Sequence, residues 1–319
     1  MRVLFFGTSA FAVPTLDTLH EASDRHLILG VVTQPDRPSG RGMQLHPSPV
    51  KRRALELGYP VFQPERVRRK PFPAEVAAMA PEALVVISFG QIIPQAMLEQ
   101  PRFGGVNVHA SLLPRWRGAA PIHHAIMAGD RDTGVATLQM EATLDTGPVY
   151  LEAREPILPG DTVGSLEPRL AALGGPLLVQ TLDRMERGAF AATPQREEGM
   201  VYAPPVTREM GFLNLLEETA VSLERRVRGT SPRPGAFLVV AGRTLKVLEA
   251  AVAEGDAGSS FPGTVSAVLK EGLVVRTAQG DFLLRVIQPE NKGAMRASDW
   301  ARGARIQVGD PARAPEKQL

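Results

Sequence analysis

The front of the sequence alternates between short apolar runs and segments with helical spacing. Val3–Phe6 and Ile28–Thr33 are rich in apolar residues, and Phe11–Leu19 between them has apolar positions three and four residues apart. This order predicts a strand, a helix and a second, parallel strand. The alternation continues with expected strands at Val61-Phe62, Leu84–Ser88, Gly105–His109 and Val135–Met140 and expected helices at Val50–Leu57, Ala74–Met79, Ile122–Met127 and Val163–Arg187. It is typical of an α/β fold with a doubly wound, mostly parallel open sheet of the Rossmann-like kind.

The pattern changes after about residue 188. Residues 189–204 are rich in Ala, Pro and Glu and have no clear period, as in a linker. One helix is expected at Glu217–Arg228, and five short strand-like runs separated by turns follow it: Phe237–Val240, Thr244–Glu249, Gly263–Leu269, Gly272–Thr277 and Asp281–Val286. Strands of this number and length predict a small β-barrel or sandwich, of which we favour an OB-like barrel. The expected organisation is therefore a domain at 1–188, a linker at 189–204 and a β-barrel domain at 205–319.

Composition places the chain among ordinary globular proteins. Hydrophobic residues make up 44% and charged residues 22% of the 319 positions, close to the average of folded proteins. No apolar run approaches the ~20 residues of a membrane-spanning helix. The apolar stretch after Met1 is too short for a signal peptide, so we expect a soluble, cytoplasmic protein without a membrane partner. Since the sequence has no cysteine, disulfides, thiolate metal ligands and cysteine nucleophiles are excluded.

The charge of the chain is nearly balanced, with 36 basic and 34 acidic residues and a net charge of +2. Divided at residue 205, the front part has 20 basic and 21 acidic residues, and the tail has 16 and 13. This asymmetry is compatible with a nucleic-acid partner for the tail. It is too small to predict such a partner by itself.

Three common kinds of active site are missing from the sequence. The first strand-to-helix turn, Gly7 to Ala12, has one glycine where the dinucleotide-binding fingerprint needs three, which disfavours a nicotinamide dehydrogenase. A zinc hydrolase is disfavoured because the sequence has no His-Glu-x-x-His pattern, and we predict no metal site. A serine nucleophile is poorly supported, because no Gly-x-Ser-x-Gly turn is present.

Polar residues occur at the carboxyl end of the strand expected at Gly105–His109. Asn107 and His109 share one face because side chains alternate along a strand, and open α/β sheets bind ligands at this end. Asp145 lies in the loop after the next strand, where it can reach the same crevice or only order its loop through an Asx-type turn. Together the three residues would supply an amide donor, a titratable imidazole and a carboxylate to orient it.

Several blocks of sequence together resemble one known family. These blocks are Thr33-Gln34-Pro35-Asp36-Arg37-Pro38 with Gly40-Arg41-Gly42, Asn107 through Ile122 with its Arg115-Trp116-Arg117-Gly118-Ala119-Ala120-Pro121 core, Leu144-Asp145-Thr146-Gly147, Ser231-Pro232-Arg233-Pro234-Gly235-Ala236-Phe237, and Gln288-Pro289. On these blocks the chain resembles the methionyl-tRNA formyltransferases from residue 2 to about residue 303. The Asn-x-His and Asp set alone marks the wider group of transferases that use formyltetrahydrofolate. The long Arg-Trp-Arg block, the Gln-Pro-Asp-Arg-Pro loop and the tail narrow the resemblance to this family.

The resemblance implies transfer of the formyl group of 10-formyltetrahydrofolate, the co-substrate, to the α-amino group of methionine on initiator tRNA. Asn107 and His109 would donate hydrogen bonds to the formyl oxygen as charge develops on it. Asp145 would favour a protonated His109 and help to remove a proton from the attacking amine. The amine attacks the formyl carbon directly, so neither a metal nor a protein nucleophile is needed. The residues that the resemblance places along the folate are Ser111, Leu112, Leu113 and Pro114, and the backbone of Phe89, Gly90 and Gln91.

The resemblance also implies a division of labour, with catalysis in residues 1–188 and tRNA binding in the barrel at 205–319. The residues expected to contact tRNA are Arg37, Arg41, Arg225, Arg228 and Arg233. The long connection Gln34–Pro49 would close on the acceptor end of the tRNA. The chain departs from the family at Met43-Gln44, where a lysine-rich step is usual, at Pro204-Pro205 and at Asn214-Leu215. We expect a monomer.

Two other functions stay open at this point. A formyltransferase that acts on a sugar nucleotide or another amine would share the three polar residues. A comparison of turnover on charged initiator tRNA and on a 4-amino sugar nucleotide separates it from the first function. The alternative from another class is a non-catalytic RNA-binding protein with the same fold. The presence of Asn107, His109 and Asp145 argues against it, and any folate-dependent formylation would exclude it.

Overall fold

The computed structural model describes residues 1–39, 44–188, 191–254 and 261–316. The chain divides into two units. Unit 1 comprises Met1–Pro121, Asp132–Pro156 and Glu167–Ala203, and unit 2 comprises Ile122–Arg131, Ile157–Leu166 and Pro204–Leu319. The chain thus enters and leaves unit 1 more than once. The predicted domain boundaries at residues 188 and 205 stay predictions about which segments fold and function separately.

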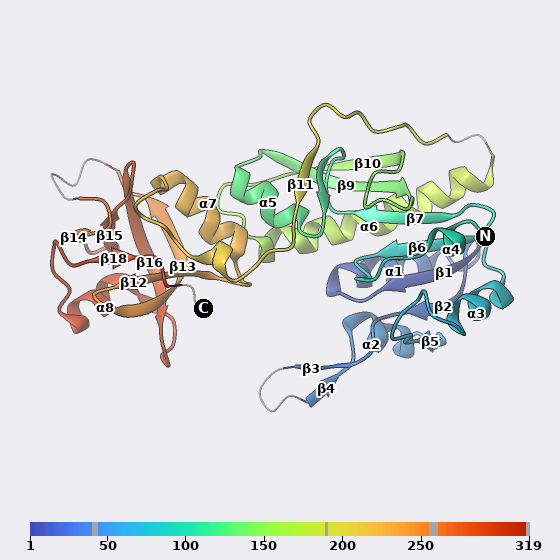
Figure 1. The fold of residues 1–319 in the computed structure, drawn as a ribbon, viewed down its shortest axis with the longest axis horizontal. Helices are drawn as coiled ribbons and strands as arrows, with labels where there is room; N and C mark the ends of the chain where they lie inside the picture. The colour runs from blue at the N-terminus through green and yellow to red at the C-terminus, as the bar shows by residue number, and fades with distance from the viewer. Residues whose placement is uncertain (40–43, 189–190, 255–260, 317–319) are drawn as a thin grey trace. The chain divides into compact units, whose positions relative to one another are not determined.

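Unit 1 is built around a seven-stranded sheet in the order β10-β9-β7-β6-β1-β2-β5 (Figure 1). Its strands are β1 (Arg2–Gly7), β2 (Leu27–Val32), β5 (Val61–Phe62), β6 (Ala83–Ile87), β7 (Gly105–His109), β9 (Asp132–Gln139) and β10 (Val149–Pro156). The strands from β5 to β7 run parallel, whereas β9 pairs antiparallel with both β7 and β10. Every residue of β6 is buried, as expected for a parallel sheet that is covered on both faces.

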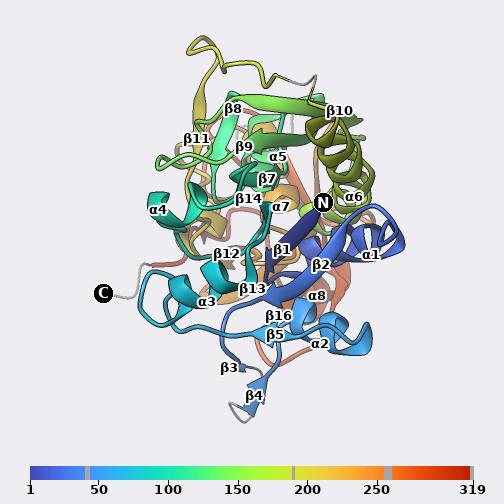
Figure 2. The ribbon, with the colours of Figure 1, turned by 90° about the vertical axis from the view of Figure 1, so that its right-hand side faces the viewer.

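Helices cover both faces of this sheet, with α1 and α6 on one side and α3 and α4 on the other (Figure 2). The helices of the first 188 residues are α1 (Val13–Glu21, after a 3-10 turn at Ala10–Ala12), α2 (Pro49–Glu56), α3 (Phe72–Met79), α4 (Gln95–Leu98), α5 (Pro121–Ala128) and α6 (Val163–Glu186). Helix α6 lies so close to α1 that a Cβ on Gly175 would be 2.3 Å from Thr18 Oγ1. The predicted doubly wound, mostly parallel sheet is confirmed. None of the helices in the described ranges combines the length and hydropathy of a transmembrane helix.

Unit 1 also contains pairings that the sequence pattern did not predict. Strands β3 (Arg37–Ser39) and β4 (Gln44–His46) form a small antiparallel ladder within the connection Gln34–Pro49. Strand β8 (Arg115–Gly118) pairs in parallel with β11 (Val201–Ala203), which lies in the segment expected to be a linker. The backbone of that segment is therefore bound to unit 1 by a strand ladder.

Unit 2 contains an antiparallel sheet in the order β14-β15-β16-β13-β12-β18, with β17 paired to β16. Its elements are a 3-10 turn (Glu209–Gly211), α7 (Ala220–Thr230), β12 (Ala236–Val240), β13 (Arg243–Val252), β14 (Val265–Val268), β15 (Leu273–Arg276), β16 (Asp281–Pro289), β17 (Met295–Arg296), α8 (Ala297–Ala304) and β18 (Ala312–Arg313). Thr264 forms a bridge with Pro311, and Val265 N donates to Asp310 O. These contacts join the two edges, so the sheet is a nearly closed barrel and the predicted small β-barrel is confirmed.

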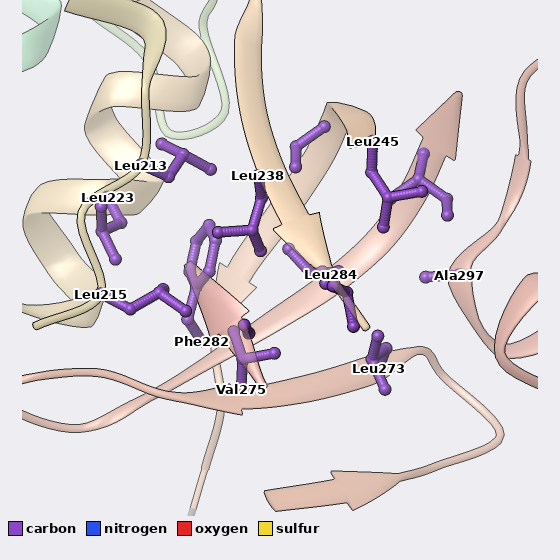
Figure 3. Close-up of a cluster of buried hydrophobic side chains, with 14 of the residues drawn as sticks. Leu213, Leu215, Leu223, Leu238, Leu245, Leu273, Val275, Phe282, Leu284 and Ala297 are labelled. Atoms are coloured by element: carbon purple, nitrogen blue, oxygen red, sulfur yellow. The ribbon is translucent and has the colours of Figure 1, made fainter. Parts of the chain in front are cut away.

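The barrel encloses an aliphatic core around the ring of Phe282 (Figure 3). Residues from the strands, from α8 and from the segments around α7 are buried in it, among them Leu213, Leu215, Leu223, Leu238, Leu245, Leu273, Val275, Leu284 and Ala297. Helix α7 also packs on α5, because a Cβ on Gly229 would lie 2.4 Å from Met127 Cγ. Residues from two distant parts of the sequence thus complete unit 2.

Candidate active site

The three polar residues predicted at the end of β7 and after β9 lie together in unit 1. Asn107 Nδ2 donates a hydrogen bond to Asp145 Oδ1 at 3.1 Å, and His109 Nδ1 lies 3.6 Å from Asp145 Oδ2. Asn107 and His109 therefore share a face of β7, as strand alternation predicts. The side chains of His109 and Asp145 are only 7% and 6% exposed. Electrostatic interactions between them are strong because little water surrounds the pair.

The second nitrogen of His109 fixes the orientation of the ring. His109 Nε2 lies 2.9 Å from the carbonyl oxygen of Trp116. Because a carbonyl oxygen only accepts hydrogen bonds, Nε2 carries the hydrogen in this arrangement. Nδ1 is then the nitrogen that faces the carboxylate of Asp145.

The Asp145 carboxylate is held by the backbone as well as by Asn107. Gly118 N donates to Asp145 Oδ2 at 2.9 Å. Gly118 has φ +120°, and a Cβ at this position would lie 2.6 Å from the carbonyl oxygen of Ala203. Only glycine fits here, so the Gly of the Arg-Trp-Arg-Gly block is needed to bring this N–H to the carboxylate. Both carboxylate oxygens of Asp145 consequently accept a hydrogen bond.

Gln195 completes the surroundings of Asp145. Its Nε2 donates to the carbonyl oxygens of Asp145 at 2.8 Å and Gly147 at 2.7 Å, and its Oε1 accepts from Arg117 Nε at 2.9 Å. The sequence reasoning missed this residue. A single amide within a segment rich in Ala, Pro and Glu has no spacing that marks it, so no signal in one sequence could have found it.

Comparison with known proteins assigns the family. Residues 1–182 match the formyl transferase family, and residues 205–305 match the formyl transferase C-terminal domain. The chain is 45% identical to the methionyl-tRNA formyltransferase of Myxococcus xanthus over 308 residues, which cover 97% of this chain and 96% of that protein. It is 43% identical to the methionyl-tRNA formyltransferase of Thermus thermophilus over 310 residues, which cover 97% and 98%. The chain belongs to the methionyl-tRNA formyltransferase family.

Two solved structures share the fold of this chain. WlaRD, a sugar 3N-formyl transferase, matches with a TM-score of 0.66 at 15% identity, over 92% of this chain and 99% of that one. HypX from Aquifex aeolicus in complex with tetrahydrofolic acid matches with a TM-score of 0.60 at 19% identity, over 94% of this chain and 47% of that one. At such low identity the likeness describes the fold alone.

The backbone that the family resemblance places along the folate lines a cavity in unit 1. The cavity has a volume of about 500 Å³, in the range of small-molecule sites, and its lining residues are Gln34, Arg37, Glu65, Arg66, Arg68, Gly90, Gln91, Ile92 and Pro94. Phe89 beside it is buried, and its carbonyl oxygen accepts a hydrogen bond from Thr8 Oγ1 at 2.9 Å. The described residues contain no group of three or more His, Asp and Glu side chains that could hold a metal ion.

The other residues that the family resemblance places along the folate, Ser111 to Pro114, pack partly into the sheet. Ser111 is fully buried, and its hydroxyl donates to the carbonyl oxygen of Arg115 at 2.7 Å. Leu113 is buried in a small cluster with Ala136 and Leu138 of β9. Leu112 and Pro114 are half-buried. These two residues therefore have the most surface to offer a bound folate, and the contact itself stays a prediction.

The arginines predicted to bind tRNA have different surroundings. Arg37 and Arg233 are exposed, whereas Arg41 lies outside the described residues. Within unit 2, Arg225 Nη1 donates to Ala128 O at 3.2 Å, and Arg228 pairs with Glu224 and donates to Asp161 O. Arg225 and Arg228 thus also stabilise the packing of α7, so Arg37 and Arg233 are the better variants for a test of tRNA contact.

The connection that carries Arg37 is anchored at its base. Lys51 Nζ of α2 lies 2.7 Å from Asp36 Oδ2, and Gln63 Nε2 donates to Asp36 Oδ1 at 2.8 Å. Hydrogen bonds from Lys51 and Gln63 lower the pKa of the Asp36 carboxyl below its ordinary value. The Pro-Asp-Arg block is therefore held at the start of the connection by Lys51 of α2 and by Gln63, which follows β5.

Proposed function

We propose that this protein transfers the formyl group of 10-formyltetrahydrofolate to the α-amino group of methionine on initiator tRNA and so supports translation initiation. The observation that carries the proposal is the cluster of Asn107, His109 and Asp145 at the end of β7. The cluster occurs in a chain that aligns over 97% of its length with proteins named methionyl-tRNA formyltransferase. Family membership and a matching site support the same activity.

The reaction is an acyl transfer in which the methionine amine attacks the formyl carbon directly. The electron pair of the C=O bond moves to oxygen and forms a tetrahedral intermediate. When the C=O bond forms again, the bond to folate N10 breaks and N10 takes up a proton. Asn107 has two amide hydrogens, of which Asp145 accepts one, so the second can stabilise the developing oxyanion.

His109 and Asp145 would handle the proton that the attacking amine loses. His109 Nδ1 and Asp145 Oδ2 are 3.6 Å apart, slightly beyond hydrogen-bond distance. A proton taken up on Nδ1 would be stabilised by the carboxylate, and the imidazolium could then donate toward the oxyanion. The buried site would exclude water from the reacting carbon.

Folate would lie along Gly90, Gln91, Leu112 and Pro114, and tRNA would contact Arg37 and the barrel of unit 2, which includes the exposed Arg233. We propose that the protein acts as a monomer in the cytoplasm, where charged initiator tRNA is used.

A single assay tests the proposed function. The protein is incubated with 10-formyltetrahydrofolate and methionyl initiator tRNA, the ester is hydrolysed, and N-formylmethionine is measured by mass spectrometry. Parallel reactions contain methionyl elongator tRNA and a 4-amino sugar nucleotide as acceptors. We expect formylation of the initiator tRNA in preference to both. Formylation of the sugar nucleotide alone, or tRNA binding without any formylation, would overturn the proposal in favour of one of the two alternatives.

A further inference from the structure

Asp145 has a left-handed backbone conformation and accepts hydrogen bonds from segments outside its own loop. Its φ is +55°, in the left-handed region, where Asp is found more often than most residues with a side chain but still in a minority of cases. The neighbouring residues Thr143 and Leu144 are exposed and cannot hold Asp145 by burial. The strand ladder of β9 and β10 does not include Asp145. The position of its carboxylate thus depends on hydrogen bonds to other segments.

Gln195 supplies those hydrogen bonds. Its single Nε2 group donates to the carbonyl oxygens of Asp145 and Gly147, at 2.8 and 2.7 Å. Both hydrogens of the amide are used on one short turn, so the turn is clamped at two points. Asn107 and Gly118 donate to the side chain of Asp145, whereas Gln195 donates to the backbone carbonyl oxygens of the turn.

Arg117 fixes which way the Gln195 amide points. Its Nε donates to Gln195 Oε1 at 2.9 Å, and the Arg117 residue is only 8% exposed. A rotated amide would place its NH₂ group against this donor and its oxygen against two carbonyls. The buried guanidinium therefore selects the single orientation in which Gln195 can hold the Asp145 turn.

The segment that carries Gln195 is itself bound on both sides. Thr193 and Val149 exchange two backbone hydrogen bonds, at 2.8 and 2.7 Å. On the other side, β11 pairs with β8 and brings Ala203 against Gly118. The same segment thus contacts β8, whose Gly118 donates to the Asp145 carboxylate, and the start of β10, which follows the turn of Asp145.

We propose that Gln195 is a positioning residue that holds the Asp145 carboxylate at the distance from His109 that formyl transfer requires. The inference rests on the proposed function, because the expected change in kcat is a change in the rate of formyl transfer. Gln195 does not touch the reacting atoms. It acts through the backbone of Asp145, and the segment 191–203 is a part of the active site and not only a connection to unit 2.

The test compares the full-length protein with Gln195→Glu and Gln195→Ala. Gln195→Glu keeps the size of the side chain and the acceptor for Arg117 but loses both donors to the turn. A matched control is Gln95→Glu, which removes an equivalent donor from an exposed pair with Glu99 on α4. We expect kcat to fall about 100-fold in both Gln195 variants, because an error of about 1 Å at a catalytic group has this effect. The KM values for folate and tRNA should stay within about twofold.

A spectroscopic readout makes the test independent of turnover. Gly118 N donates to Asp145 Oδ2, so its amide resonance in ¹H–¹⁵N NMR reports whether the carboxylate is in place. We expect this resonance to move and its hydrogen exchange to accelerate in Gln195→Glu, and not in Gln95→Glu. An unchanged Gly118 resonance, or a loss of activity that only follows the fraction of unfolded protein, would overturn the positioning role. If the wild type does not formylate tRNA but the Gly118 resonance still moves in Gln195→Glu, the proposed function is contradicted and the positioning of Asp145 by Gln195 is supported.

Discussion

Asp145 accepts hydrogen bonds from several parts of the chain that are far apart in sequence. Asn107 comes from β7, Gly118 from β8 and Gln195 from the segment before β11, and all three donate to Asp145. Sequence pattern could place Asn107 and His109 on one face, because strand alternation is a local rule. Contacts with Gln195 and Trp116 depend on tertiary structure, so a single sequence has no information from which to predict them.

The first prediction concerns His109. His109→Ala should lower kcat by roughly two to three orders of magnitude, as the loss of one oxyanion donor does. The dissociation constant for folate should change little, because the interaction strengthens mainly in the transition state. Steady-state kinetics and equilibrium folate titration measure the two effects. His20→Ala, which removes a ring that contacts Tyr59 outside the site, is the control, and equal turnover in both variants would contradict the assignment.

The second prediction concerns His26, which is fully buried beside Asp183. Burial lowers the pKa of His26 below its ordinary value of 6.5, although the nearby Asp183 and Glu186 carboxylates oppose the shift. Below pH 6.5 the unfolded chain therefore binds this proton more readily than the folded chain does. The free energy of unfolding should fall as the pH decreases below about 6.5.

Urea unfolding at a series of pH values tests this second prediction. His26→Gln retains a hydrogen-bond donor but cannot titrate, so its free energy of unfolding should depend less on pH below 6.5 than that of the wild type. His20→Gln keeps His26 and should keep the full dependence. If the free energy of unfolding of His26→Gln depends on pH as strongly as that of the wild type, the acid sensitivity comes from other groups.

At the scale of elements, the long apolar patterns were sufficient to predict the main structure. The helix expected at Val163–Arg187 is α6, and the runs expected around residues 237–286 are β12 to β16. The expected core strands of the parallel sheet were also found, because buried apolar runs are a strong local signal. Strand β10 was missed because all of its residues are exposed or half-buried, and its short apolar start, Val149-Tyr150-Leu151, is followed mainly by charged residues. Strands of two or three residues, such as β11 and β18, have too few positions to form a pattern.

The third prediction concerns the contact between α6 and α1. Gly175→Ala should destabilise the protein by about 1–3 kcal/mol, because the new Cβ would lie 2.6 Å from Thr18 Cβ and the core resists overpacking. Gly303→Ala in α8 is the matched control. A Cβ on Gly303 would point into open space, with no other segment within 4 Å, so helix propensity should make this change stabilising by about 0.5–1 kcal/mol. Thermal unfolding of the two variants measures the difference, and a stabilised Gly175→Ala would refute the close packing.

At the scale of the whole molecule, the charge of the tail fits a contact with nucleic acid. The tail has 16 basic and 13 acidic residues beyond residue 204, whereas the front is close to neutral. Several of the basic groups are paired inside the barrel unit, as Arg226 is with Glu218 and Arg276 with Asp281. We therefore expect exposed arginines such as Arg233 to contribute more to tRNA affinity than the total charge does.

The fourth prediction is that tRNA affinity depends on salt through these exposed arginines. The logarithm of the association constant should fall with the logarithm of salt concentration, by about 0.9 for each phosphate neutralised on a duplex stem. Arg37→Ala and Arg233→Ala should each weaken tRNA binding and reduce the slope by about that amount. Folate binding should be unchanged in Arg233→Ala, because Arg233 is not among the residues that line the cavity with Arg37. Arg102→Ala removes an arginine that stacks on Phe103 and is the control. Filter binding at several salt concentrations gives the slopes, and identical slopes in all variants would exclude the predicted contacts.

The division of unit 2 between distant segments has a consequence for synthesis on the ribosome. Helix α5 ends at Ala128 and packs on α7, which begins at Ala220. At about 5 to 20 residues per second, roughly 5 to 20 seconds separate the appearance of the two helices. During this time the face of α5 that receives Gly229 has no native neighbour, while β9, β10 and α6 are still being made. The nascent chain is therefore expected to leave Met127 of α5 without its native contact until the tail arrives.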